Sequence, residues 1–184
     1  GAGVESGKKD LFKNRPWVAT PNHKTDPKSL EVIHQLAIDL GSKWFTTQPE
    51  KYDQAVALIS HLPVLVSAAL LRTVATLQDP TISQLAASLA STGFADTTRV
   101  GSGNPILGTS MAANNTTAIL ESLKSYRSCL DQLESAILKG HWQELQTALE
   151  QNQALRPNFL ESTIELTNPA AKTTHAQPLT DDKQ

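Results

Sequence analysis

The stretch from Thr116 to Gly140, TTAILESLKSYRSCLDQLESAILKG, decides the fold class of this chain. Its apolar residues recur at alternating spacings of four and three, which are the a and d positions of a heptad repeat. The spacing predicts a helix with one continuous apolar stripe, and Gly140 ends it because glycine readily closes a helix. The stripe consists of Ile119, Leu123, Tyr126, Leu130, Leu133 and Ile137.

On both sides of this heptad helix the apolar spacing stays helical. A last helix follows from Trp142, and upstream Pro80 and Pro105 each begin a helix, since proline is tolerated in the first helical turn. Residues 91–104 are polar and contain glycines, which predicts a loop. Cys129, inside the heptad helix, is expected to be a small buried residue. The predicted fold class is therefore mainly α.

A long helix from Pro49 precedes these segments and is apolar on nearly all sides. Between residues 55 and 71 the only polar side chains belong to two serines and His61. This run barely reaches the roughly 17–25 residues that cross a bilayer, so we favour a helix buried among other helices over a membrane span. Pro63 leaves a carbonyl of the preceding turn without its partner, which predicts a disturbance of the helix near His61.

The N-terminal segment follows a different pattern. Two short β-type runs, Pro16–Pro21 and Lys43–Thr47, flank a helix that Asp26 caps, Pro27 begins and Gly41 ends. One strand, one helix and one strand are too few to form a sheet alone, so they indicate the last part of a larger α/β sheet.

Composition limits the partners of this chain. Its 184 residues include 16 Lys and Arg against 18 Asp and Glu, a balance that excludes an electrostatic nucleic-acid binder. The single cysteine excludes an internal disulfide and a cysteine-based zinc site, and the histidines lack metal-ligand spacing, so no metal is expected. No signal-peptide pattern is present, and we expect a cytoplasmic location.

The number of apolar helix faces between residues 49 and 165 predicts an intertwined helical domain that packs against a second copy. Beyond Leu166 the sequence is rich in Thr, Pro, Ala and Lys without periodicity, which predicts a disordered tail.

The segment Asp96–Pro105, DTTRVGSGNP, is the first candidate binding site. Gly101 and Gly103 allow a close approach of the backbone to a ligand, and Arg99 carries a planar group that matches a carboxylate or a phosphate. The alternative is a surface arginine in an ordinary loop, and the residues alone leave both open.

His61 is the second candidate. On the sequence alone we favour a core histidine that hydrogen-bonds a neighbouring helix. The alternative is a ligand-binding histidine, because a helix disturbed by Pro63 beside an imidazole is a plausible docking point.

Three segments, taken in order, resemble the prephenate/arogenate dehydrogenases of tyrosine biosynthesis, and most of all their cyanobacterial type. The segments are DQAVA (53–57), ISHLP (59–63) and GFADTTRVGSGNP (93–105). The resemblance implies an NADP- or NAD-dependent oxidative decarboxylation of arogenate or prephenate, which makes the ring aromatic. It also implies an N-terminal Rossmann-type domain followed by a helical domain that interlocks as a homodimer.

In this family's terms, residues 1–48 would be the C-terminal remnant of the nucleotide-binding domain. Residues 49–165 would be the substrate-binding and dimerisation domain, and residues 166–184 the tail. The family's glycine-rich cofactor loop and its catalytic His-Pro motif would both lie upstream of Gly1. We therefore assign no catalytic residue, leave the cofactor-binding residues unknown and expect the chain alone to be inactive.

The resemblance also implies roles for three residues. Arg99 would bind the substrate carboxylate, His61 would line the pocket for substrate and for tyrosine as a feedback inhibitor, and Asp96 would help to hold the arginine. Tyr52 and Ser102 depart from the family pattern, which often has histidine and glycine there. The cyanobacterial likeness favours arogenate and NADP.

Two other functions remain as alternatives. One is a non-catalytic helical module for oligomerisation or ligand sensing. The other is a helical chorismate mutase, which we rank last because such sites hold a dianion with several cations, whereas the long helices carry only Arg72 and Arg127.

Overall fold

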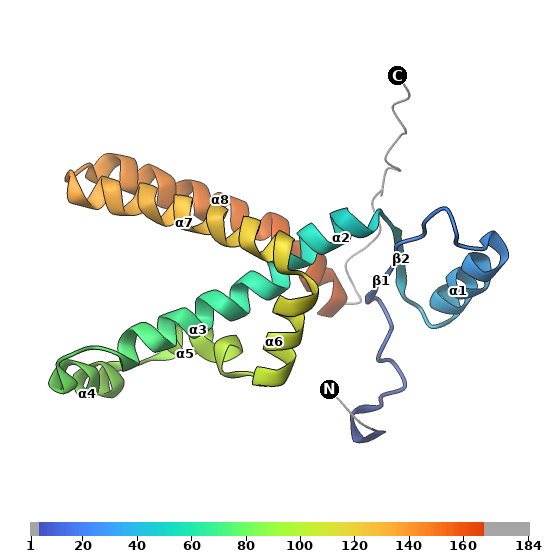
Figure 1. The fold of residues 1–184 in the computed structure, drawn as a ribbon, viewed down its shortest axis with the longest axis horizontal. Coiled ribbons are helices and arrows are strands. Elements are labelled where there is room, and N and C mark those ends of the chain that lie inside the picture. Colours follow the sequence, from blue (N-terminus) through green and yellow to red (C-terminus); the bar gives the residue numbers. More distant parts are fainter. Residues whose placement is uncertain (1–3, 168–184) are drawn as a thin grey trace.

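The computed structural model describes residues 4–167, and within them the chain is mainly helical, as predicted. Two arms diverge from a common junction (Figure 1). One arm is a pair of long antiparallel helices, and the other is a long helix with shorter helices along it and at its tip (Figure 1). A small α/β unit lies on the opposite side of the junction (Figure 1).

The α/β unit is a strand–helix–strand unit with parallel strands. Strand β1 (Pro16–Ala19) pairs with β2 (Lys43–Thr46), and Pro16 lies opposite Lys43. Helix α1 (Pro27–Asp39) connects them, and it begins where the Asp26 carboxylate accepts a hydrogen bond of 2.9 Å from the Ser29 amide. Gly41 ends the helix with a φ of 73°, a conformation that favours glycine. These boundaries confirm the predicted cap and stop.

One continuous helical stretch crosses the junction and changes its winding there. Helix α2 (Pro49–Val56) passes through a π-helical turn (Ala57–His61) into α3 (Leu62–Ala75). The Leu62 amide donates to the Ala57 carbonyl, five residues back. The turn ends two residues before Pro63, whose ring would crowd the carbonyl four residues back in a regular α-helix. The predicted disturbance near His61 therefore takes the form of a π turn.

The segment predicted as a polar loop is helical, and that prediction was wrong. After α4 (Pro80–Leu89), residues 92–98 form α5 (Thr92–Thr98) and the chain continues as a 3₁₀ helix (Arg99–Ser102). Its residues are poor helix formers, but the segment packs along α3, and the Gly101 amide donates to the Ser67 hydroxyl at 2.8 Å. Tertiary contacts thus override the local preference.

The remaining helices follow the predicted order. They are α6 (Pro105–Asn114), α7 (Thr116–Leu138) and α8 (Trp142–Thr167). Gly140, with a φ of 66°, ends the heptad helix and lets α8 fold back along α7 (Figure 1). Helix α8 runs two residues into the segment expected to be a tail, and the rest of that segment, 168–184, lies outside the described residues.

The buried core is small and sits at the junction. Ala57 of the π turn packs with Ala118 and Ile119 of α7, and Leu65, Ala112 and Leu123 cover this cluster. Along the arms, in contrast, the apolar stripe is open to solvent: Leu130 is 45% exposed and Ile137 53%.

Two expectations of burial fail for the single chain. Cys129 is exposed, and within the long apolar helix only Ala57 and Ser67 are buried. The physical reason is that the arms diverge, so among the described residues much of the apolar surface of each arm stays open to solvent. Among residues 4–167, the stretch Pro49–Ala75 passes a length-and-composition test for a membrane span, a test that core helices of soluble proteins also pass.

Candidate functional site

His61 lies at the end of the π turn, half-buried, beside an open groove of about 400 Å³. The groove runs between the α2 side of the turn and the C-terminal part of α6. Its polar lining is suited to a ligand that makes hydrogen bonds. It is lined by Tyr52, Asp53, Val56, Ser60, His61, Ser110, Met111, Asn114 and Asn115.

Asn115 joins the α6–α7 connection to the π turn. Its side-chain Nδ2 donates to the Asp53 carbonyl at 2.8 Å and lies 3.4 Å from His61 Nδ1. His61 is thus hydrogen-bonded to a neighbouring helix terminus, as the core interpretation predicts, and it also lines a groove, as the ligand interpretation requires. Both interpretations of His61 describe part of its surroundings.

Arg99 begins the 3₁₀ helix and is exposed. Gly101, two residues after Arg99, lies directly against α3 and so fixes the position of the turn that carries Arg99. A Cβ atom on Gly101 would be 2.4 Å from the Ala68 nitrogen, so only glycine fits there. Ser67, which accepts the Gly101 hydrogen bond, is only 1% exposed. The close approach that glycine permits is therefore to helix α3, whereas the sequence suggested an approach to a ligand.

Asp96 lies in α5, three residues before Arg99, and both side chains are exposed. Within residues 4–167 no ion pair joins them, and the Arg99 guanidinium has no hydrogen-bonding partner. An uncommitted guanidinium on an anchored turn is free to bind an external carboxylate.

His61 lies directly before α3 and Arg99 lies in the 3₁₀ helix that packs against α3, but the structure does not bring the two residues into one cavity. Arg99 is absent from the lining of the His61 groove. The six residues from His61 to Ser67, which anchors the arginine turn, correspond to about 9 Å of helical rise. A ligand that contacts both side chains would therefore have to extend along α3.

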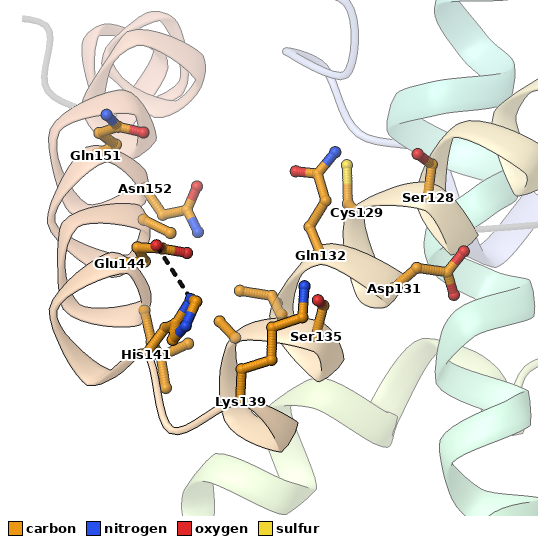
Figure 2. A pocket seen from close by; sticks show the side chains of 14 residues that line it. Ser128, Cys129, Asp131, Gln132, Ser135, Lys139, His141, Glu144, Gln151 and Asn152 are labelled. Carbon is orange, nitrogen blue, oxygen red and sulfur yellow. Dashed lines mark ion pairs between the residues drawn. The ribbon is translucent and has the colours of Figure 1, made fainter.

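A second, larger cavity of about 660 Å³ lies between α7 and α8, and the sequence offered no motif for it. Figure 2 shows Cys129, Gln132 and Lys139 on α7 facing His141 and Glu144 at the start of α8. His141 Nδ1 lies 3.1 Å from Glu144 Oε1, but both side chains are largely exposed, so the pair contributes at most about 1 kcal/mol.

No residues for a metal or a nucleotide are brought together in the described part of the chain. Residues 4–167 contain no group of three His, Cys, Asp or Glu side chains that could hold a metal ion. Their sheet has two strands, and no glycine-rich turn connects a strand to a helix in it. The described residues therefore do not fit a dinucleotide.

Comparison with known proteins decides the family. The family model for the dimerization domain of prephenate dehydrogenase matches residues 48–151, which is more than half of the chain and includes His61, Asp96 and Arg99. This chain belongs to the prephenate dehydrogenase family. The family resemblance and the fold class are thereby confirmed.

Relatives and solved structures agree with this membership. The chain is 27% identical to the prephenate dehydrogenase of Bacillus subtilis, matching 74% of this chain and 36% of the relative. It is 27% identical to the cyclohexadienyl dehydrogenase of Zymomonas mobilis, matching 84% of this chain and 56% of the relative. Both relatives of this chain are dehydrogenases. The chain spans between about a third and just over half of their length.

Two crystal structures resemble the fold closely. Synechocystis arogenate dehydrogenase is 46% identical, with a TM-score of 0.80, over 85% of this chain and 56% of that one. The prephenate dehydrogenase from A. aeolicus in complex with hydroxyphenyl propionate and NAD+ is 25% identical, with a TM-score of 0.79, over 85% of this chain and 54% of that one.

Asn115 and Ser67 are the site residues that sequence reasoning missed. Each is a common residue type with no motif around it, and each acts through a partner far away in the sequence: Asp53 and His61 for Asn115, and Gly101 for Ser67.

Proposed function

We propose that this chain is the substrate-binding and dimerisation part of an NAD(P)-dependent dehydrogenase that oxidatively decarboxylates arogenate or prephenate. The observation that carries the proposal is the 46% identity to Synechocystis arogenate dehydrogenase over 85% of the chain. The same likeness favours arogenate as substrate and NADP as cofactor. Because the described residues hold no dinucleotide site, we derive no cofactor step from them.

In this proposal Arg99 binds the substrate carboxylate. Its guanidinium is exposed and has no hydrogen-bonding partner among residues 4–167, and the Gly101–Ser67 contact holds its turn against α3. His61 lines the pocket for the ring end of the substrate, and tyrosine, as a feedback inhibitor, would compete for the same place. Asp96, which lies in α5 three residues before Arg99, would help to hold the arginine.

The domain division follows the family match. Residues 1–48 are proposed as the end of the nucleotide-binding domain, residues 49–165 as the helical domain and residues 166–184 as a tail; the match to the dimerization domain begins at residue 48, which supports the first boundary. The family description and the open apolar stripe support a homodimer. In this dimer, a second copy covers the apolar faces of the arms. The proposed location is the cytoplasm, and neither a membrane nor a nucleic acid is proposed as a partner.

The test is Arg99→Ala in the enzyme assembled with its nucleotide-binding domain. Loss of a charged hydrogen-bonded contact, worth about 1.5–3 kcal/mol, should raise KM for arogenate at least about tenfold. Arg72→Ala is the matched control, because Arg72 is an exposed arginine in the last turn of α3. A KM within twofold of the wild type would contradict the assignment.

A complete enzyme that forms no reduced nicotinamide with either substrate would instead favour a non-catalytic oligomerisation or ligand-sensing module. The chain alone, assayed in the same way, should form none.

A further inference from the structure

The orientation of the Asn115 amide is determined by its partners. The atom that faces the Asp53 carbonyl at 2.8 Å must be the NH₂ group, because two carbonyl oxygens would repel each other at that distance. The same NH₂ group lies 3.4 Å from His61 Nδ1. One of its hydrogens therefore serves Asp53 and the other faces the imidazole.

A ring nitrogen that faces a donor must accept. Neutral imidazole carries one proton, so the proton of His61 then resides on Nε2. We propose that Asn115 is a positioning residue that fixes His61 in the Nε2–H tautomer, which makes His61 a hydrogen-bond donor to an oxygen of the ligand in the groove. The identity of the ligand as a cyclohexadienyl substrate rests on the proposed function. The tautomer of His61 does not depend on that function.

The backbone around Asn115 supports a dedicated role. Asn115 occupies the N-cap position of α7, where an asparagine side chain most often accepts a hydrogen bond from the first turn of its own helix. Here its side chain makes no such bond. The amide instead contacts Asp53 of α2 and His61 of the π turn, although this leaves the first turn of the 23-residue helix α7 without a side-chain cap.

The amide also spans the π turn. Asp53 lies in α2 before the turn, and His61 is its last residue. A π turn displaces the residues after it relative to those before it. By binding both, Asn115 holds the imidazole at one place relative to α2 and thus relative to the groove that both line.

The experiment measures the His61 tautomer directly by long-range ¹H–¹⁵N correlation spectra of the ¹⁵N-labelled 184-residue chain at alkaline pH, where imidazole is neutral. A His61→Gln variant assigns the signals among the five histidines. The same chain in denaturant supplies the reference ratio of His61 tautomers, because unfolding removes the contact between Asn115 and His61. The wild type should exceed that ratio in favour of Nε2–H, and equality with it would overturn the proposal.

Asn115→Asp replaces the donor with an acceptor, so the tautomer ratio should shift by at least about tenfold toward Nδ1–H. The matched control is Asn114→Asp, which adds the same charge one residue away on the same groove, where the native amide donates to the Ser110 carbonyl and not to His61. An unchanged ratio in Asn115→Asp, or an equal shift in Asn114→Asp, would overturn the proposal.

If Asn115→Asp does not fold by circular dichroism, Asn115→Leu decides, because leucine has a similar size and no hydrogen-bonding group. Its ratio should fall to that of the denatured chain, and a ratio equal to the wild type would overturn the proposal. No substrate is present in these spectra, so their outcome is independent of the Arg99→Ala kinetics. Either result can fail without the other.

Discussion

The junction and the arms place the same kinds of apolar residue in opposite surroundings. Ile119 and Ile137 belong to one heptad stripe of α7, yet Ile119 is 4% exposed and Ile137 is 53% exposed. At the junction α2, α3, α6 and α7 converge on the π turn, whereas along the arms much of the apolar surface of the described residues stays open to solvent. A regular sequence pattern can thus combine a core within one chain with a surface for another.

The largest expected effect breaks the packing of the 3₁₀ helix against α3, which is a tight contact within an arm. Gly101→Val would place side-chain atoms within the Ser67–Ala68 backbone and disrupt the Gly101–Ser67 hydrogen bond. Overpacking of about 3 kcal/mol and a lost hydrogen bond of about 1 kcal/mol should lower the free energy of unfolding by about 4 kcal/mol. Urea denaturation measures this loss.

The control for that variant is Gly93→Ala in α5, where an added Cβ atom would meet nothing within 4 Å. It should leave the stability unchanged or raise it by up to about 1 kcal/mol. Equal losses in both variants would mean that Gly101 is not the anchor of this turn.

The second effect compares junction and arm on one helix. Ile119→Ala removes a buried side chain and should cost about 3 kcal/mol at every protein concentration. Ile137→Ala should act only where a second copy covers the stripe, so its shift in melting temperature should depend on protein concentration. Sedimentation of the wild type alongside gives the association state. A stable monomer at micromolar concentration would contradict the homodimer.

The smallest effect concerns a helix cap at the tip of an arm. The Thr81 hydroxyl and amide donate to the Asp79 carboxylate at 2.6 and 2.8 Å, and these bonds hold the pKa of Asp79 below its usual range. The stabilisation is therefore present above the unfolded pKa of about 3.9 and is lost as the pH falls through the lower folded value.

Asp79→Asn keeps a good cap that does not titrate. In thermal melts, the wild type should lose stability relative to this variant when the pH is lowered from 7 to 3. Equal acid sensitivity in both proteins would show that the carboxylate at residue 79 is not the titrating group.

Local signals predicted the helix boundaries well. Asp26 caps α1, Pro80 and Pro105 begin α4 and α6, and Gly41 and Gly140 end helices with positive φ. Each of these features depends on atoms within a few residues, so a short stretch of sequence contains its cause. The parallel pairing of β1 and β2 was foreseen only as the edge of a sheet.

The candidate site was harder to predict because its contacts are distant in sequence. Arg99 and His61 were found through their motifs, and the helix around His61 was predicted, but the helical state of the segment around Arg99 was not. The hydrogen bond between Gly101 and Ser67 spans 34 residues, and the bond between Asn115 and Asp53 spans 62. Neither partner carries a local signal, since serine and asparagine have many roles.

Periodicity and caps, which are short-range properties of the backbone, were sufficient to define a mainly helical chain that follows a strand–helix–strand unit. Only the packing of distant segments decided three other features. They are the divergence of the arms, the exposure of Cys129 and the pairing of Asn115 with His61. Hydrophobic spacing determines which face of a helix avoids water, but it does not say whether the same chain or another chain covers that face.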